Sequence, residues 1–465
     1  MGMNPKHAPK ILTSEELEAA IAQFAQQVST LFNEKLTNAQ AHETKFVERE
    51  SKLTGHLFLT IFTFGISIYG TPSLNDLVGL LNAVVPHLSI RRQGLHERIT
   101  EKAVAFFEKM LSSAIAVQLP KRLTTGMLTL CPLFKRIFLF DSTAFQLPNE
   151  LAEYFRGSGG GGSDAAIKIL FGYDLKSSQF FYVLEDGTAP DHLINYGFIN
   201  KMAAEDLEIS DLGFFNIEAF WRIDKKGAFY LSRMKANVNV YSDPQATQVI
   251  DLVKLLKKLK TNDAEIEVYL KTGKHIIKSR LIIERMPDEI KAKRLRTINQ
   301  HNKKRGHQTQ YRTKVLAGFN LYVTNTSSEL VPRKMIRTLY GIRWQVELVF
   351  KSWKSNFALS KVTGKQPERI KCLIYAKLLF ITITTKIAAV SRNYVWLTSQ
   401  QEVSCFQAAK YLKTIAMTWL KAIIQQPDNV PDFIENAIRF IATNCLKGRS
   451  RKRVYPLTII NNLGA

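Results

Sequence analysis

The stretch from Tyr340 to Lys354, YGIRWQVELVFKSWK, constrains the fold of this chain more than any other. At about 100° per residue on an α-helix, its charged residues gather on one side and its aliphatic residues on the other. The polar side carries Tyr340, Arg343, Trp344, Glu347, Lys351 and Lys354, and the apolar side carries Ile342, Val346, Val349 and Trp353. We therefore expect an amphipathic helix whose apolar side is buried.

The polar side holds a single acid among three bases, whereas a solvated helix usually mixes charge signs at i,i+4. From the pattern alone, an ordinary amphipathic helix and a helix that holds a polyanion beside a metal ligand are equally consistent. The spacing Tyr-x2-Arg-x3-Glu-x6-Lys distinguishes them. It resembles the Y-R-E-K signature of bacterial DDE transposases of the insertion-sequence-four family, and the resemblance is specific over residues 130–365.

The charge of the chain favours a polyanionic partner. Its 465 residues, enough for two to four lobes, include 64 Lys and Arg against 40 Asp and Glu, a net charge of +24. Phosphates that are neutralised by basic side chains release counterions, which drives binding. Nucleic acid and membrane headgroups are the two candidates.

Two apolar runs bear on the membrane alternative. The run 57–69 is too short to span a bilayer, and the run 372–390 is interrupted by Lys377 and Lys386, so we expect both to be buried helices. The N-terminus lacks the apolar core of a secretion signal. We expect a cytoplasmic protein, bacterial and nucleoid-associated when bound to DNA, with no membrane partner. Its four cysteines lack metal-ligand spacing, which predicts reduced, mostly buried thiols.

Residues 1–130 are expected to form a helical N-terminal region. Its first helix is predicted to start at Ser14, with Glu15 and Glu16 complementing the helix dipole. Short helices near 73–81 and 90–100 permit a helix-turn-helix-like module, although a plain helical bundle fits at least as well. In the family that the signature resembles, this region recognises the terminal inverted repeats of the element.

Residues 131–235 are predicted to form the first part of an α/β core. Strands are expected at 136–141, 165–173, 179–184, 207–211 and 227–235, and helices at 192–205 and 214–222. This order is that of the ribonuclease H-like fold. Gly157–Ser163 matches GxGxxG, but the segment after it is strand-like, so we interpret it as a mobile connector.

Two of these strands are predicted to end in an acid, Asp141 and Asp211, at the edge of the sheet where α/β sites are built. An isolated Asp at such a position is more often a cap or turn former. Its chemistry therefore depends on its partners.

A basic, β-rich insertion is expected at residues 236–328, with strands at 265–270, 275–285 and 318–324 and a helix at 248–260. From Lys271 to Lys314 there are 14 Lys and Arg and 3 Asp and Glu, an excess that favours phosphate contact over a merely solvated face. The resemblance implies that this insertion contacts transposon-end DNA.

The core helix with the third acid is expected within residues 329–365, and helices fill the C-terminal region 366–465. The cluster Lys447–Arg453 either touches DNA or is a disordered end. The resemblance implies that C-terminal helices pair two subunits, which predicts a homodimer in the DNA complex.

Asp141, Asp211 and Glu347 supply three hard oxygen donors without His or Cys, a set that suits Mg²⁺ or Mn²⁺. Two such ions can activate a water or a 3′-hydroxyl and stabilise the leaving oxygen at phosphorus. The resemblance implies strand cleavage at the ends of an insertion sequence and strand transfer into target DNA.

Cations and rings near these acids are assigned to double-stranded DNA: Tyr340, Arg343, Trp344, Lys351, Lys354, Arg233 and Lys235. In some relatives a Trp of the insertion captures a displaced base. None of the five Trp of this chain lies there, so the candidates are Tyr241, Tyr269, Tyr311 and Tyr322.

Two other functions stay open at this point. A nuclease of the same fold would cut DNA without joining it. A basic DNA-binding regulator would bind DNA independently of metal.

Overall fold

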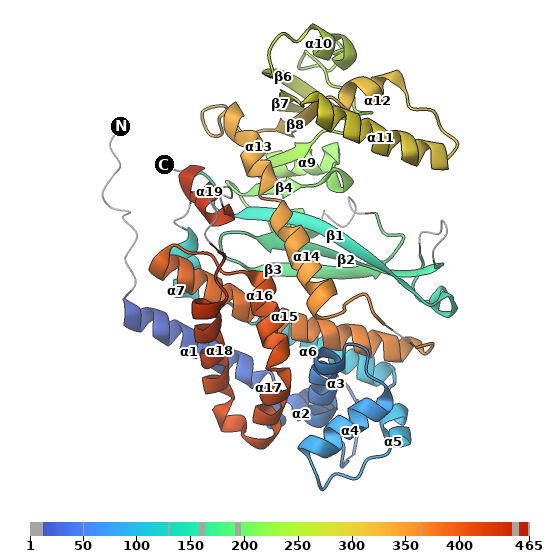
Figure 1. Ribbon diagram of the computed structural model, residues 1–465, viewed down its shortest axis with the longest axis vertical. Helices are drawn as coiled ribbons and strands as arrows, with labels where there is room; N and C mark the ends of the chain where they lie inside the picture. Colours follow the sequence, from blue (N-terminus) through green and yellow to red (C-terminus); the bar gives the residue numbers. More distant parts are fainter. Residues whose placement is uncertain are drawn as a thin grey trace.

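A computed structural model describes residues 13–49, 51–128, 131–157, 163–190, 197–362, 364–448 and 455–463. A body of helices from both ends of the chain lies below a central sheet, and an upper lobe holds the insertion strands and helices (Figure 1). The mixed α/β class predicted from the sequence is confirmed. The connector predicted at Gly157–Ser163 lies largely outside the described residues, as do the first residues of the helix predicted at 192–205.

The central sheet brings the first five strands together in the order β3-β2-β1-β4-β5. The first three pair antiparallel, whereas β4 and β5 run parallel to β1. The continuous apolar run Ile137–Phe140 is buried on both faces, as expected for a central strand. The strands are β1 (Ile137–Leu147), β2 (Ala165–Asp174), β3 (Phe180–Asp186), β4 (Leu207–Ser210) and β5 (Phe229–Arg233).

The insertion strands extend this same sheet. β8 (Phe319–Thr324) pairs antiparallel with β5, and β7 (His275–Arg285) and β6 (Asp263–Thr272) follow, which completes eight strands. Helices α10 (Leu252–Lys258), α11 (Asp288–Lys304) and α12 (Tyr311–Leu316) complete the upper lobe. The long helix α11 was not predicted, because its sequence has no apolar stripe wide enough to be recognised, and none of its residues is buried.

The two ends of the chain, each predicted to be helical, pack together in one helical body. Helix α15 runs along α6, and α1 packs against α18. Helix α1 begins at Ser14, as predicted, and its N-cap is Thr13, which forms a capping box with Glu16. The N-terminal helices are α1 (Ser14–Thr30), α2 (Glu34–Glu43), α3 (Gly55–Tyr69), α4 (Leu74–Val84), α5 (Arg92–Glu97), α6 (Glu101–Ala116) and α7 (Lys121–Leu128). The C-terminal helices are α15 (Pro367–Ser399), α16 (Cys405–Thr414), α17 (Ala416–Gln425), α18 (Val430–Asn444) and α19 (Pro456–Leu463).

Among the described residues, one helix, α15, is long and apolar enough to cross a membrane, and 89% of its most apolar window is buried inside the protein. Its two interior lysines are also buried, and they donate to backbone carbonyls. Lys377 Nζ lies 2.7 Å from Ala358 O, and Lys386 Nζ lies 2.9 Å from Ile115 O. Each ammonium therefore ties α15 to another part of the body, which is the arrangement of a core helix.

The stretch from Tyr340 to Lys354 forms two helices, and the prediction of one continuous helix is wrong. Helix α13 (Arg333–Gly341) ends where i→i+3 hydrogen bonds replace the i→i+4 bonds of an α-helix, and α14 (Trp344–Asn356) begins after Ile342 and Arg343. Ile342 N bonds to Leu339 O at 3.1 Å and Arg343 N to Tyr340 O at 3.1 Å. This tight turn at Gly341–Arg343 keeps both helices on the front of the sheet (Figure 1).

Candidate active site

Asp141 lies on β1, and Asp211 directly follows β4, the parallel strand next to β1. Phe140 pairs with Ser210, and each aspartate is the residue that follows. Adjacent strands are about 4.8 Å apart, so the two carboxylates emerge next to each other on the face that α14 covers. Asp211 directly follows β4, as predicted. Asp141 does not end its strand, because β1 continues to Leu147 along its antiparallel pairing with β2.

Helix α14 brings Glu347 to the same face. Val346, Phe350 and Trp353 are buried, and the Trp353 ring meets Phe171 of β2 edge-on at 5.0 Å. The predicted apolar side of the stretch is confirmed, since Ile342 is also buried and Val349 packs on the core. Glu347 lies on the opposite side of the helix, with its side chain about one-third exposed.

Arg343 lies among the three acids. One guanidinium nitrogen is 3.5 Å from Asp141 Oδ2, and another donates to Glu347 Oε1. Asp211 interacts electrostatically with the same guanidinium and accepts a 3.5 Å hydrogen bond from the Tyr340 hydroxyl. Since the Arg343 side chain is only 13% exposed, the protein balances this cluster of carboxylates with an internal cation.

The protonation of the cluster reflects this crowding. The pKa of Asp141 is raised to about 6, mainly by burial and also by the negative charges of Asp211 and Glu347, while the Ser142 N–H and Arg343 partly offset the rise. Burial and Asp211 together raise the pKa of Tyr340 to about 12. Tyr340 therefore acts as a hydrogen-bond donor at neutral pH.

The three carboxylates provide the oxygen donors that Mg²⁺ or Mn²⁺ prefers, so the donor set fits the predicted ions. In the part of the chain that the structure describes, however, no three His, Cys, Asp or Glu side chains are arranged to hold a metal ion. Arg343 is the cation found among these acids. The Nε of Arg343 is buried and has no hydrogen-bond partner among the described residues, so one donor of the guanidinium lacks an acceptor there.

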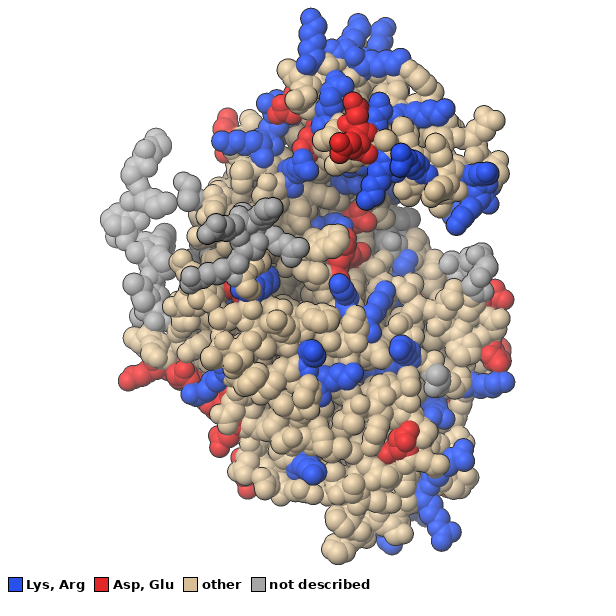
Figure 2. Space-filling view, viewed as in Figure 1, with Lys and Arg blue, Asp and Glu red and all other residues tan. Residues whose placement is uncertain are grey.

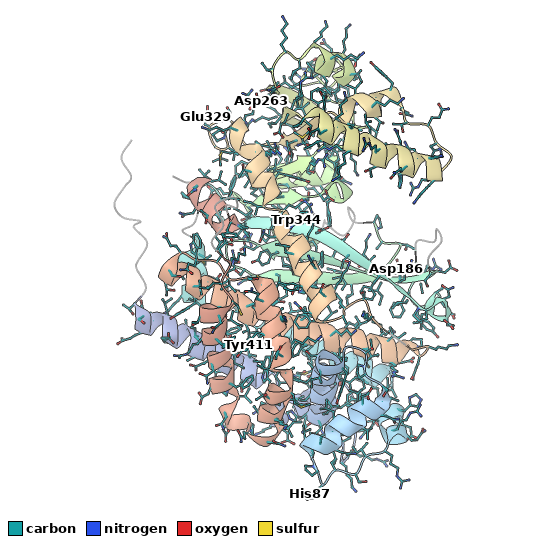
Figure 3. The ribbon with its side chains drawn as sticks, viewed as in Figure 1. His87, Asp186, Asp263, Glu329, Trp344 and Tyr411 are labelled. Carbon is teal, nitrogen blue, oxygen red and sulfur yellow. The ribbon has the colours of Figure 1, made fainter. Side chains whose placement is uncertain are left out.

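The other predicted residues of the stretch lie at the surface of the same helix. Trp344 is 58% exposed and lies at the centre of this face, where α13 meets α14 (Figure 3). Lys351 and Lys354 are exposed further along α14. All three are accessible to a ligand that lies across the acids.

Arg233 and Lys235, at the end of β5, lie on the other side of Asp211. Lys235 donates to Phe215 O at 3.1 Å and thereby holds the loop that follows Asp211. Arg233 lines a hollow of about 580 Å³ together with Leu212, Lys293 and Arg294. Of these two cations, Arg233 is the one that lines this hollow.

Sequence reasoning missed two further arginines near this hollow. Arg294 of α11 donates to Phe319 O at 3.2 Å and to Asn320 Oδ1 at 2.7 Å, and Arg337 of α13 pairs with Glu284 at 2.6 Å. The charges of Arg233 and Arg337 lower the pKa of Arg294 together with burial, which is the larger cause. The basic density of residues 271–314 includes Arg294 without singling it out, and Arg337 lies outside that range.

The four tyrosines considered for base capture lie in different environments. Tyr322 is buried, 5.2 Å from the Tyr340 ring, so its faces are already covered. Tyr241 and Tyr269 pair through their backbones. Tyr311 is exposed, with Lys257 over its ring at 4.8 Å.

Comparison with known families decides the identity. The family model described as "Transposase DDE domain" matches residues 132–383, more than half of the chain, and this range includes all three acids. The chain belongs to the DDE transposase family. It is an enzyme that cleaves DNA strands and transfers them.

Curated relatives match this transposase over nearly its full length. The transposase of insertion sequence element IS231F from Bacillus thuringiensis subsp. israelensis is 29% identical over 97% of this chain and 96% of its own. The transposase of IS231C from B. thuringiensis subsp. berliner is 30% identical over 95% of both chains. The transposase of IS1151 from Clostridium perfringens is 28% identical over 83% of this chain and 84% of its own.

Among solved structures, the piggyBac transposase synaptic complex with hairpin DNA aligns with a TM-score of 0.43 and 12% identity, over 94% of this chain and 87% of that one.

Proposed function

We propose that this transposase cleaves DNA at the ends of its insertion sequence and joins those ends to target DNA at one site, built from Asp141, Asp211 and Glu347. The observation that carries this proposal is the convergence of three carboxylates on one basic residue, Arg343, from two strands and a helix. A structural ion pair needs one carboxylate for one arginine. Three around one guanidinium leave an excess of negative charge that a divalent cation can balance.

The three carboxylates would hold a pair of Mg²⁺ or Mn²⁺ ions, which would activate the oxygen nucleophile and stabilise the leaving oxygen. The residues of the chain position the DNA for this step. Tyr340 donates a hydrogen bond at the acids, and Arg343 neutralises charge that develops on the phosphate. Neither residue changes protonation near neutral pH.

Double-stranded DNA is the substrate that the charge distribution supports. Lys and Arg crowd the upper lobe above a recess on this face (Figure 2). Trp344, Lys351 and Lys354 lie below it on α14, and Arg233 lies beside Asp211. We propose that end DNA follows this basic surface across the acids, with the helical region 1–130 reading the terminal inverted repeat and a second subunit completing the complex.

We also assign the chain to the insertion-sequence-four family and its sheet to the ribonuclease H-like class. The Tyr340-x2-Arg343-x3-Glu347-x6-Lys354 spacing supports the family, and the order β3-β2-β1-β4-β5 supports the fold. A cytoplasmic location agrees with a DNA substrate and with buried cysteines at 131, 372 and 445.

The test is a cleavage assay on DNA that carries the ends of the element itself, with Mg²⁺ and, in parallel, with Ca²⁺. Asp141→Asn, Asp211→Asn and Glu347→Gln should each abolish cleavage and retain binding of end DNA. Full cleavage by any one of these variants with Mg²⁺ would refute the site.

A second experiment incubates pre-cleaved ends with supercoiled plasmid. It separates a transposase from a nuclease, because only a transposase yields joined products. DNA binding that is independent of metal and is not followed by cleavage would indicate a regulator.

A further inference from the structure

One arginine of the basic insertion, Arg280, is largely enclosed by the protein. Arg280 lies on β7, the strand between β6 and β8, and its side chain is 12% exposed. A buried guanidinium requires acceptors for its donors, since an unpaired buried charge is strongly unfavourable. The acceptors of Arg280 come from two different parts of the protein.

On one side, Arg280 binds the insertion sheet. Its Nε and Nη2 lie 2.7 and 2.9 Å from the two carboxylate oxygens of Glu265 on β6. This two-point contact fixes the plane of the guanidinium, because both parallel hydrogen bonds have to form together.

On the other side, Arg280 holds the segment that leads into α13. Its Nη1 lies 2.9 Å from Thr326 O, 2.8 Å from Ser327 O and 3.1 Å from Val331 O. Val331 is fully buried, and α13 begins two residues later, at Arg333. The start of α13 is therefore held by the insertion sheet.

Helix α13 has two further links to the same strands. Arg333 pairs with Asp263 of β6 at 3.0 Å, and Arg337 pairs with Glu284 of β7 at 2.6 Å. Both arginines are more than two-fifths exposed, so each pair contributes little by itself. Arg280 is the buried member of this set and holds three carbonyls at once.

We propose that Arg280 is a positioning residue for DNA cleavage. By fixing the carbonyls of residues 326–331, it sets the place of the α13–α14 pair, and hence of Arg343 and Glu347 relative to the aspartates on β1 and β4. The inference rests on the proposed function of the three acids. Its consequence is that the insertion acts on the chemical step as well as on DNA binding.

The chain offers a matched control in Arg136, at the start of β1. Its guanidinium also binds a carboxylate at two points, Asp206, and also donates to a backbone carbonyl, Lys201 O at 3.0 Å. These contacts link the start of β1 to residues 201–206 and do not involve α13. The variants Arg280→Gln and Arg136→Gln therefore remove the same kind of structural contact, and only the former releases the catalytic helices.

The experiment measures thermal stability, the affinity for end DNA and the single-turnover cleavage rate at saturating DNA with Mg²⁺, below the unfolding temperature of both variants. Arg280→Gln is expected to cleave about 100-fold more slowly with little change in affinity, because displacement of a catalytic group by about 1 Å costs that much. Arg136→Gln is expected to cleave at nearly the normal rate. Equal losses of cleavage in both variants, or a loss of affinity by Arg280→Gln that accounts for its slow cleavage, would overturn the proposal.

Arg280→Lys keeps the test decisive if Arg280→Gln does not fold. A lysine can still donate to the three carbonyls but loses the two-point contact with Glu265. The Arg280→Lys protein should therefore cleave more slowly than the wild type, but by less than the loss of about 100-fold expected when the helices are released. A folded Arg280→Lys protein that cleaves at the wild-type rate or not at all contradicts the proposal. Asp141→Asn in the same assay separates the two failures, because cleavage by that variant refutes the site itself, whatever Arg280 does.

Discussion

Arg343 forms an ion pair with Asp141 of β1 in the candidate active site, with Nη1 3.5 Å from Oδ2. Burial raises the pKa of Asp141, and the positive charge of Arg343 opposes this rise, so that the pKa of Asp141 is about 6 with Arg343 in place. Arg343 therefore helps to keep Asp141 ionised near neutral pH. The carboxylate has to be ionised to bind a cation.

Replacement of Arg343 should therefore shift the pH dependence of cleavage. In Arg343→Gln the pKa of Asp141 rises further, so at subsaturating Mg²⁺ cleavage is lost at a higher pH on the acid side than in the wild type. Arg343→Lys, which retains the charge, should stay close to the wild-type profile. Rates between about pH 5 and pH 9 measure this, and an unchanged acid limb in Arg343→Gln would show that the charge of Arg343 does not act on Asp141.

His56 predicts how stability responds to acid. The side chain is buried in α3, and burial lowers its pKa to about 4, below the ordinary value of 6.5. The unfolded chain therefore takes up a proton first as the pH falls. His56 lowers the free energy of unfolding by up to about 1.4 kcal/mol per pH unit between about pH 6.5 and pH 4.

Urea denaturation of the wild type and His56→Leu across this range measures the effect. The variant should lose less stability on acidification than the wild type. Asp141 acts in an overlapping range with the opposite sign, because its raised pKa makes stability fall as pH rises from about 4 to about 6, so the comparison is made between the two proteins at each pH. Parallel pH profiles of the two proteins would contradict the assignment to His56.

Gly172 of β2 tests how tightly the side chains of the sheet pack beneath the site. A Cβ at this position of β2 would lie 2.3 Å from Phe181 Cε2 and 2.8 Å from Phe140 Cε1. Gly172→Ala is therefore expected to destabilise the protein by about 1–3 kcal/mol, because rings on both neighbouring strands have to move. Gly79→Ala on α4, where nothing lies within 4 Å, should instead stabilise it by up to about 1 kcal/mol. Equilibrium unfolding compares the two, and a neutral Gly172→Ala would contradict this packing.

The sequence predicted the elements of the site better than their connections. The continuous apolar run before Asp141 identified β1, because a buried central strand is continuously apolar, and β4 was predicted as the strand before Asp211. The break between α13 and α14 was not predictable from periodicity, since Ile342 and Arg343 keep right-handed helical backbone angles and only their hydrogen bonds tighten. The apolar face of the stretch therefore stayed correct although its continuity did not.

Contacts between distant segments were beyond sequence reasoning. Arg343 among the acids and Arg280 against residues 326–331 depend on the packing of segments far apart in the chain. The length of β1 beyond Asp141 depends on its partner β2, which is 10 residues long and pairs with it up to Leu147. A local sequence pattern does not indicate which distant residue a side chain or strand will contact. These contacts, and the length of β1, were therefore visible only in the tertiary structure.

The end of α11 tests the proposed path of DNA. Lys303, Lys304 and Arg305 are exposed in the upper lobe, at the end of a helix that buries none of its residues. If they contact phosphates, the triple change to Gln should weaken binding of end DNA about equally for all sequences. It should also reduce the slope of log affinity against log salt by up to about 3, since each lost phosphate contact removes about 0.9.

A triple variant is needed because a single contact changes the slope by little. Lys102 and Lys109 of α6 provide the control, since each pairs with an acid, Glu48 at 2.6 Å and Glu43 at 2.8 Å. Their change to Gln lowers the net charge but should leave the salt slope almost unchanged. Fluorescence anisotropy with labelled end DNA over a range of salt concentrations measures both slopes. Effects in proportion to the charge removed, three in the α11 set and two in the control set, would mean that net charge, and not contact at α11, governs binding.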